Sequence, residues 1–193
     1  MTWLADARRG GGILGALGSH HTDCLRTFFG EPTRVLASVR TDQPHRGSEL
    51  ATADDACTLH YEFGHGASAL VDLSGAVPYR WERFEIHGEQ ASLRWDETGY
   101  HLWRLEAGKE PAALEIPARH ALAPREGDPA LVAPFGVLVD RLHRAITRSE
   151  PLDPNFAADA VPVQCALDAC RASSVAGTSV AVEPAPAPAV TPA

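Results

Sequence analysis

The stretch GGGILGALGSHHTD, residues 10–23, sets a glycine triplet directly before apolar residues that recur at helical spacing. One stripe holds Ile13, Leu17, Cys24 and Phe28, and a neighbouring stripe holds Leu14, Leu25 and Phe29. Gly30 stands where a helix commonly ends, and Pro32 blocks its continuation. The spacing therefore predicts a helix over residues 13–29 that starts straight after the glycines.

The glycine run also spells a dinucleotide-binding fingerprint, since Gly10, Gly12 and Gly15 satisfy the G-x-G-x-x-G spacing. Such a loop needs a buried strand before its first glycine and an acidic residue about 20 positions later. Residues 1–9, MTWLADARR, do not make that strand, and Asp42 comes too late. We therefore interpret the triplet as a place of close backbone approach, to a ligand or to another domain.

Beyond residue 33 the apolar pattern changes from helical spacing to alternation, which is typical of β-strands. The alternating segments are RVLASVRT (34–41), ACTLHYEF (56–63), ASALVDL (67–73), the surroundings of Phe84 and Ile86, those of Leu93 and Trp95, YHLWRLEA (100–107) and ALEI (113–116). Short connections such as GHG (64–66) favour one antiparallel meander. Helical spacing returns over residues 131–146 and 161–171, and these helices are expected to cover the apolar face of the meander.

The predicted fold is α+β, an open and mainly antiparallel β-sheet with helices packed on one face. The opposite face is mixed and would carry Thr58, His60, Glu62, Leu70, Asp72, Glu85, His87 and Arg94. We expect one domain over residues 1–183. Residues 184–193, PAPAPAVTPA, are expected to form a disordered tail because they bury too little apolar surface to order themselves.

Composition and charge argue against several classes of protein. The chain of 193 residues is 45% hydrophobic, yet no apolar run approaches the roughly 20 residues that span a bilayer, so no membrane partner is expected. A formal net charge of −8 without a basic cluster disfavours nucleic acid as a partner. Cys24, Cys57, Cys165 and Cys170 form no C-x-x-C pair and indicate reduced thiols in a cytoplasmic protein.

Several segments together resemble the second domain of the Gfo/Idh/MocA family of NAD(P)-dependent sugar oxidoreductases. The resembling segments are the W-x-x-D lead at Trp3 and Asp6, the glycine triplet with the following G-x-H-x-x-D, FFGE (28–31), FEIHGEQASLRWD (84–96) and PLDPNFAADAVPVQCALDACRASSVAGTSVAV (151–182). The resemblance implies the C-terminal domain fold of glyceraldehyde-3-phosphate dehydrogenase. It also implies a preceding Rossmann domain with a catalytic Glu-Lys-Pro motif, which this sequence does not contain.

The same resemblance suggests the site residues. It makes His20 a candidate catalytic acid or base, Asp23 a candidate for orienting it, and Gly10, Gly11, Gly12 and His20 candidates for substrate binding. Ala16 departs from the family pattern, which has an aspartate there. His21 and Asp23 also spell H-H-x-D, but adjacent helical residues do not chelate one ion, so no metal is expected.

The resemblance thus implies a substrate-binding and oligomerisation domain of a sugar (polyol) oxidoreductase, separated from its nucleotide-binding domain. Such a chain would bind no NAD(P) alone, would be inactive alone, and would obtain the cofactor through a separate Rossmann-domain subunit. A sugar-like substrate and a homo-oligomer formed through the open sheet face are further expectations. The alternative is a non-catalytic dimerising or ligand-binding module that keeps only the fold.

Overall fold

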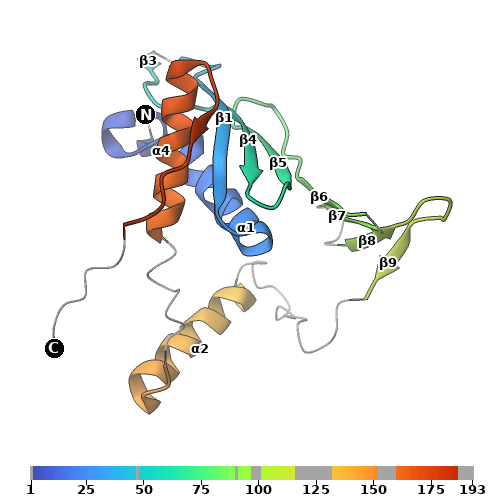
Figure 1. The fold of residues 1–193 in the computed structure, drawn as a ribbon. Helices are drawn as coiled ribbons and strands as arrows, with labels where there is room; N and C mark the ends of the chain where they lie inside the picture. Colours follow the sequence, from blue (N-terminus) through green and yellow to red (C-terminus); the bar gives the residue numbers. More distant parts are fainter. Residues whose placement is uncertain are drawn as a thin grey trace. The chain divides into compact units, whose positions relative to one another are not determined.

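The computed structural model describes residues 2–46, 48–89, 91–96, 101–115, 132–151 and 160–186. The chain forms two compact units, one of Met1–Val77 with Asp153–Ala193 and one of Pro78–Leu152 (Figure 1). The predicted division into a domain over residues 1–183 and a tail over 184–193 stays a prediction, and residues 187–193 lie outside the described part. Within the described residues, no helix is both long and apolar enough to cross a bilayer.

The first unit is built on a four-stranded antiparallel sheet. Its strands, in spatial order, are β10 (Val180–Ala181), β1 (Pro32–Arg40), β4 (Ala56–Phe63) and β5 (Ser68–Ser74). Three of these match the predicted strands closely, and β4 has the predicted bounds. The β4–β5 hairpin turns at Gly64–Gly66, where Gly66 has a φ of +89° that glycine adopts without strain.

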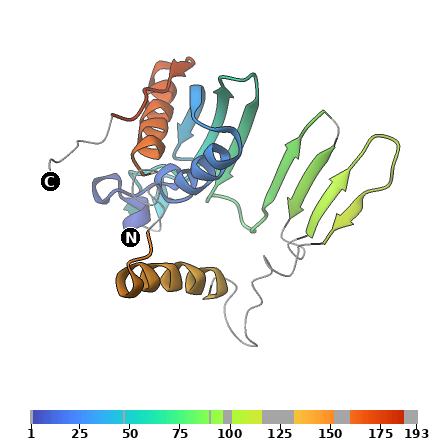
Figure 2. The same ribbon diagram turned by 60° about the horizontal axis from the view of Figure 1, so that its bottom comes forward.

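Two helices, α1 (Ser19–Phe29) and α4 (Ala160–Ala176), pack beside this sheet and against each other (Figures 1 and 2). The fully buried apolar side chains of this core include Leu14, Val35, Cys57, Leu59, Tyr61, Ala166, Leu167 and Cys170. The strand residues among them share one face, because Val35 pairs with Tyr61 in the ladder. The prediction of a helix-covered apolar face is therefore confirmed for this sheet and for the last predicted helix.

The opposite face of the sheet carries the predicted mixture of side chains. Leu36 pairs with His60, and His60 pairs with Leu70, so these three form a row across β1, β4 and β5. Leu70 is 72% exposed at the end of that row. Thr58 donates a hydrogen bond to Asp72 Oδ1 at 2.8 Å beside it. This face thus carries two exposed leucines on either side of His60, with the polar pair of Thr58 and Asp72 beside them.

The edge of β1 is closed by two different elements. β10 pairs with β1 only at Arg34 and Val35. Further along, the amide of Ala37 donates to Ser173 Oγ at 2.9 Å, and the amide of Val39 donates to Ser174 Oγ at 2.8 Å. Serine side chains of α4 therefore accept the hydrogen bonds of the β1 amides that β10 does not pair with.

Short elements surround the start of the chain. Two 3₁₀ turns, η1 (Trp3–Ala5) and η2 (Ala7–Arg9), precede the glycine triplet, and a small β2–β3 hairpin (His45–Arg46 and Glu49–Leu50) follows β1. Residues 2–9 therefore contain no strand, which agrees with the expectation from the sequence.

The described residues of the second unit form a four-stranded antiparallel meander and one helix. The strands are β6 (Arg83–His87), β7 (Ser92–Asp96), β8 (His101–Leu105) and β9 (Ala112–Leu114), and the helix is α2 (Val132–Arg148). The ladder aligns Phe84 with Trp95, Trp95 with Leu102, and Leu102 with Leu114 on one face. All of these elements occur where the sequence predicted them.

The expectation of one continuous meander is wrong. The strands form two separate four-stranded sheets, since β5 and β6 do not pair in the described structure. The chain leaves the first sheet where the amide of Gly75 donates to the carbonyl of Asp55 at 2.7 Å, and bends follow up to Tyr79. Pro78 lies in that stretch and has no amide hydrogen to continue a ladder. Packing of α2 on the first sheet stays a prediction, because α2 belongs to the other unit.

Candidate functional site

The candidate site lies at the start of the helical segment that contains α1. The amide of Ile13 donates to the carbonyl of Asp54 at 3.0 Å, and the amide of Leu14 donates to the Asp54 carboxylate Oδ2 at 2.8 Å. The first amides of a helix have no partner within it, so Asp54 caps this one from a distant part of the chain. A carboxylate at this end also interacts favourably with the helix dipole.

The glycine triplet is explained by contacts within the chain. Gly10 has a φ of +74° and ends η2 in the left-handed conformation. A Cβ on Gly11 would lie 2.4 Å from the carbonyl oxygen of Trp3. A Cβ on Gly12 would lie 2.2 Å from Asp54 Oδ1, and its φ of +120° is also unfavourable for other residues. The close approach is therefore to the chain itself, and substrate binding by Gly10–Gly12 stays a prediction.

A π-helical turn, Leu14–Gly18, stands between the glycines and α1 (Ser19–Phe29). Its bond runs from the amide of Ser19 to the carbonyl of Leu14, which accommodates one more residue than an α-helical turn. Apolar spacing alone gave no sign of it. Turns of this kind are frequent at functional sites.

The π turn changes which predicted stripe is buried. The core-facing residues are Leu14, Gly18, Thr22 and Leu25, whereas Leu17 and Phe28 of the first predicted stripe are 47% and 56% exposed. Ile13 of the same stripe is only 6% exposed, so this stripe is buried at its start and exposed farther along the helix. The physical reason is the extra residue, which rotates the following helix relative to an uninterrupted one.

His20 lies on α1 with an exposed side chain, two residues beyond the π turn. No hydrogen bond or ion pair of its ring occurs within the described part of the chain. Asp23 is held elsewhere, because Arg26 Nη1 donates to its Oδ1 at 3.1 Å while Arg26 Nη2 lies 2.6 Å from Glu31 Oε1. The roles predicted for His20 and Asp23 remain predictions.

Ala16 brings no carboxylate to the start of the helix, and its side chain is half-buried. Among the described residues, no group of three or more His, Cys, Asp or Glu side chains is arranged to hold a metal ion. His20 therefore offers an accessible imidazole at this surface.

Below the helix lies a buried polar chain. The Tyr61 hydroxyl is 2.9 Å from Thr22 Oγ1 and 3.1 Å from Cys170 Sγ. Burial raises the pKa of the Tyr61 phenol far above its ordinary value, with Cys170 adding to the effect. Burial likewise raises the pKa of Cys57 to about 12 and that of Cys170 to about 11. These groups stay neutral, which suits a structural role in the core.

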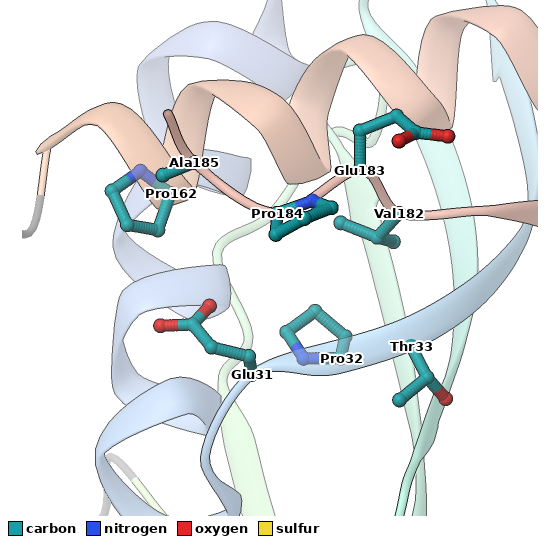
Figure 3. Close-up of a pocket in the computed structure, with 8 residues that line it drawn as sticks. All are labelled: Glu31, Pro32, Thr33, Pro162, Val182, Glu183, Pro184 and Ala185. Atoms are coloured by element: carbon teal, nitrogen blue, oxygen red, sulfur yellow. The ribbon is translucent and has the colours of Figure 1, made fainter. Parts of the chain in front are cut away.

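A separate cavity of about 310 Å³ opens elsewhere in the first unit (Figure 3). It is lined by Glu31, Pro32, Thr33, Pro162, Val182, Glu183, Pro184 and Ala185. None of the predicted site residues lines it, and the carboxylate of Glu31 is already bound by Arg26. The cavity therefore belongs to a different part of the surface from His20.

The fold and this helix start define a class of protein, an α+β domain with an open antiparallel sheet backed by helices. Residues 1–94 match the family model of the GFO/IDH/MocA C-terminal domain. This match covers nearly half of the chain and agrees with the resemblance that the sequence segments indicated. The chain is 24% identical over 169 residues to an uncharacterized oxidoreductase of Synechocystis sp., which covers 80% of this chain and 45% of that protein.

Solved structures share the fold. A levoglucosan dehydrogenase in complex with NADH and levoglucosan superposes with a TM-score of 0.77 at 23% identity, over 95% of this chain and 54% of that one. An oxidoreductase domain protein from Kribbella flavida gives the same TM-score, identity and coverage. An aldose-aldose oxidoreductase from Caulobacter crescentus, complexed with glycerol, gives 0.71 at 22% identity, over 93% and 50%. The chain spans about half the length of these relatives.

Sequence reasoning missed Asp54 completely. It lies 40 residues from Leu14 along the chain, and no local pattern links the two. A glycine in the triplet signals that something approaches closely, but the sequence does not say what. The predicted alternatives were a ligand or another domain, whereas the structure shows Trp3 and Asp54 of the same chain.

Proposed function

We propose that this chain is the substrate-binding and oligomerisation domain of a sugar (polyol) oxidoreductase whose NAD(P) is bound by a separate Rossmann domain. The observation that carries the proposal is the accessible His20 on a helix whose start is fixed by the glycine triplet and Asp54. The match of residues 1–94 to the GFO/IDH/MocA C-terminal domain model supports it. The relatives named above, one crystallised with levoglucosan and one with glycerol, suggest a polyhydroxylated substrate.

The residues around the glycine triplet do not fit a dinucleotide. Residues 2–9 form no strand, and the space beside Gly12 is filled by the Asp54 carboxylate, which would repel a pyrophosphate. NAD(P) is therefore assigned to the other domain. His20 would act as general base, accepting the proton of the substrate hydroxyl that is oxidised.

The uncovered sheet face supports the oligomerisation part of the proposal. The row of Leu36, His60 and Leu70 leaves exposed apolar side chains within a polar margin. Such a surface resembles the core and rim of a protein interface. A second copy of the same face is the expected partner.

The alternative function is a non-catalytic dimerising or ligand-binding module. Two observations favour it: Ala16 replaces the carboxylate of the family pattern, and Asp23 is paired with Arg26. Neither residue then stabilises a charged His20. The two functions differ in one measurable respect, which is whether His20 matters for turnover.

The test combines this chain with a separately expressed Rossmann domain of a relative and follows NADH formation with levoglucosan. The isolated chain should show no turnover, and the mixture should show some. His20→Ala should then lower the rate by about 100-fold or more, the usual effect of losing a general base. His21→Ala is the matched control, since a neighbouring residue points about 100° away on the helix. Equal rates for wild type and His20→Ala would favour the non-catalytic module.

A further inference from the structure

Asp54 connects the start of the helix to a loop that several hydrogen bonds hold in place. The amides of Thr52 and Ala53 donate to the carbonyl of Ala5, at 2.9 and 3.3 Å. Its neighbour Asp55 is buried, and its carboxylate accepts the amides of Asp42 at 2.6 Å and Gln43 at 3.0 Å. The Asp54 carboxylate therefore projects from backbone that is held on both sides.

Gly12 is the counterpart of this carboxylate. A Cβ at residue 12 would lie 2.2 Å from Asp54 Oδ1, so only glycine lets the carboxylate reach the amide of Leu14. Both residues are thus required for one contact, although 42 positions separate them in the sequence. The contact therefore gives Gly12 and Asp54 one shared structural role.

The contact is made at the residue where the π turn begins. Leu14 is the first residue of the turn, and its amide is bound by Asp54 rather than within the helix. The amide of Ala16 donates to the carbonyl of Gly12 at 3.0 Å, so the glycine takes part in the same arrangement. Six residues beyond Leu14, His20 leaves the helix toward solvent.

We propose that Asp54 is a positioning residue for His20: it fixes the π turn, and the π turn sets the direction of the imidazole. One residue more in the turn rotates everything beyond it by about 100° relative to a continuous α-helix. Without the cap, the segment is free to relax to an ordinary α-helix, and His20 turns away from its present direction. The catalytic consequence rests on the proposed function, but the geometric one does not.

The test uses the full chain and three variants. Asp54→Ala removes the cap, Asp54→Asn retains an acceptor oxygen, and Gly12→Ala displaces the carboxylate from the other side of the contact. Asp168→Ala is the matched control, because Asp168 is a 73% exposed aspartate on α4 that pairs with Arg171. Two-dimensional NMR follows the amides of residues 14–20, the His20 ring, and the amides of Leu59 and Val71 in the sheet.

Asp54→Ala and Gly12→Ala should both shift the Leu14 amide and the His20 ring signals while the sheet amides stay in place. Asp54→Asn should preserve most of the wild-type spectrum, and Asp168→Ala all of residues 14–20. A folded Asp54→Ala with an unchanged His20 ring overturns the proposal. If Asp54→Ala fails to fold, Gly12→Ala decides by the same criterion.

Turnover separates this proposal from the proposed function. In the assembled enzyme Asp54→Ala should lower kcat by about tenfold to 100-fold, as expected for a misplaced catalytic group, with little change in KM. Asp54→Asn should restore most of kcat. Absence of turnover by the wild-type chain with a Rossmann partner would contradict the proposed function. The NMR result would still decide whether Asp54 positions His20.

Discussion

Thr22, Tyr61 and Cys170 place three polar side chains in the core of the first unit, where each finds a partner in another. Tyr61 is 1% exposed, and Cys57 on the same strand is fully buried. A buried polar group without a partner costs about 1–3 kcal/mol, so this chain of contacts removes that cost. The thiols and the phenol are stable here only as neutral groups.

The raised thiol pKa values predict a loss of stability at alkaline pH. Cys57 and Cys170 stay protonated in the folded protein up to about 12 and about 11, respectively. In the unfolded chain a thiol ionises near about 8.5, so above that pH the unfolded state binds fewer protons. The free energy of unfolding should therefore be flat below about pH 8 and fall above it by at most about 1.4 kcal/mol per pH unit for each thiol.

Urea unfolding measured between neutral and alkaline pH tests this expectation. Cys57→Ala removes one of the two buried thiols and should make the alkaline decline shallower. A decline of the same steepness in the variant would show that other groups cause it.

At the scale of single residues, the sequence indicated which residues are important but not which contacts they make. It singled out His20 and the glycine triplet, and the structure places His20 on the surface of α1. It did not predict that Asp54 occupies the space beside Gly12, because that contact joins residues 42 positions apart. The sequence analysis also gave no ion pair between Arg26 and Asp23, although their i, i+3 spacing favours one.

At the scale of elements, α4 stabilises the sheet in two ways. Its apolar side covers the strands, and its serines bind the amides of β1 that β10 does not reach. Ser173 is fully buried, and its hydroxyl also donates to the carbonyl of Thr178 at 2.7 Å. The edge of β1 is thereby closed to other strands, which limits edge-to-edge association.

Ser173→Ala should lower the free energy of unfolding by about 1–3 kcal/mol, since it leaves the buried amide of Ala37 without an acceptor. Val175→Ala on the same helix is the control, because Val175 is 92% exposed. Its effect should stay within about 0.5 kcal/mol. Chemical denaturation of both variants provides the measurement, and equal stabilities would contradict a role for the serine in closing the edge.

Elements were predicted well where the apolar period is unambiguous. β4 has the predicted bounds, and α4 (Ala160–Ala176) includes the predicted residues 161–171. The π turn and β10 were missed because each depends on tertiary contacts. β10 has only two residues, and the π turn starts at an amide bound by Asp54. The break after β5 was missed because alternation continues on both sides of Pro78.

At the scale of the whole molecule, we expect the open face of the first sheet to form the interface between two copies of the chain. Leu70→Lys places a charge at the exposed end of the row of Leu36, His60 and Leu70 and should shift a homodimer to monomers. Val175→Lys is the control, since it adds the same charge at an exposed residue of α4. Light scattering at tens of micromolar should show dimers for wild type and for the control. A wild-type monomer would contradict the proposed oligomerisation.

The division of labour between two domains is the central claim. It rests on what the chain lacks around Gly10–Gly12 and on the accessible His20. The most direct measurement is an NMR titration of the isolated chain with NADH and, separately, with the sugar used for turnover. The account predicts that the sugar shifts signals of His20 and the neighbouring glycines, and that NADH at low micromolar concentration shifts none of them. Saturable shifts of Gly10–Gly12 with NADH would contradict it.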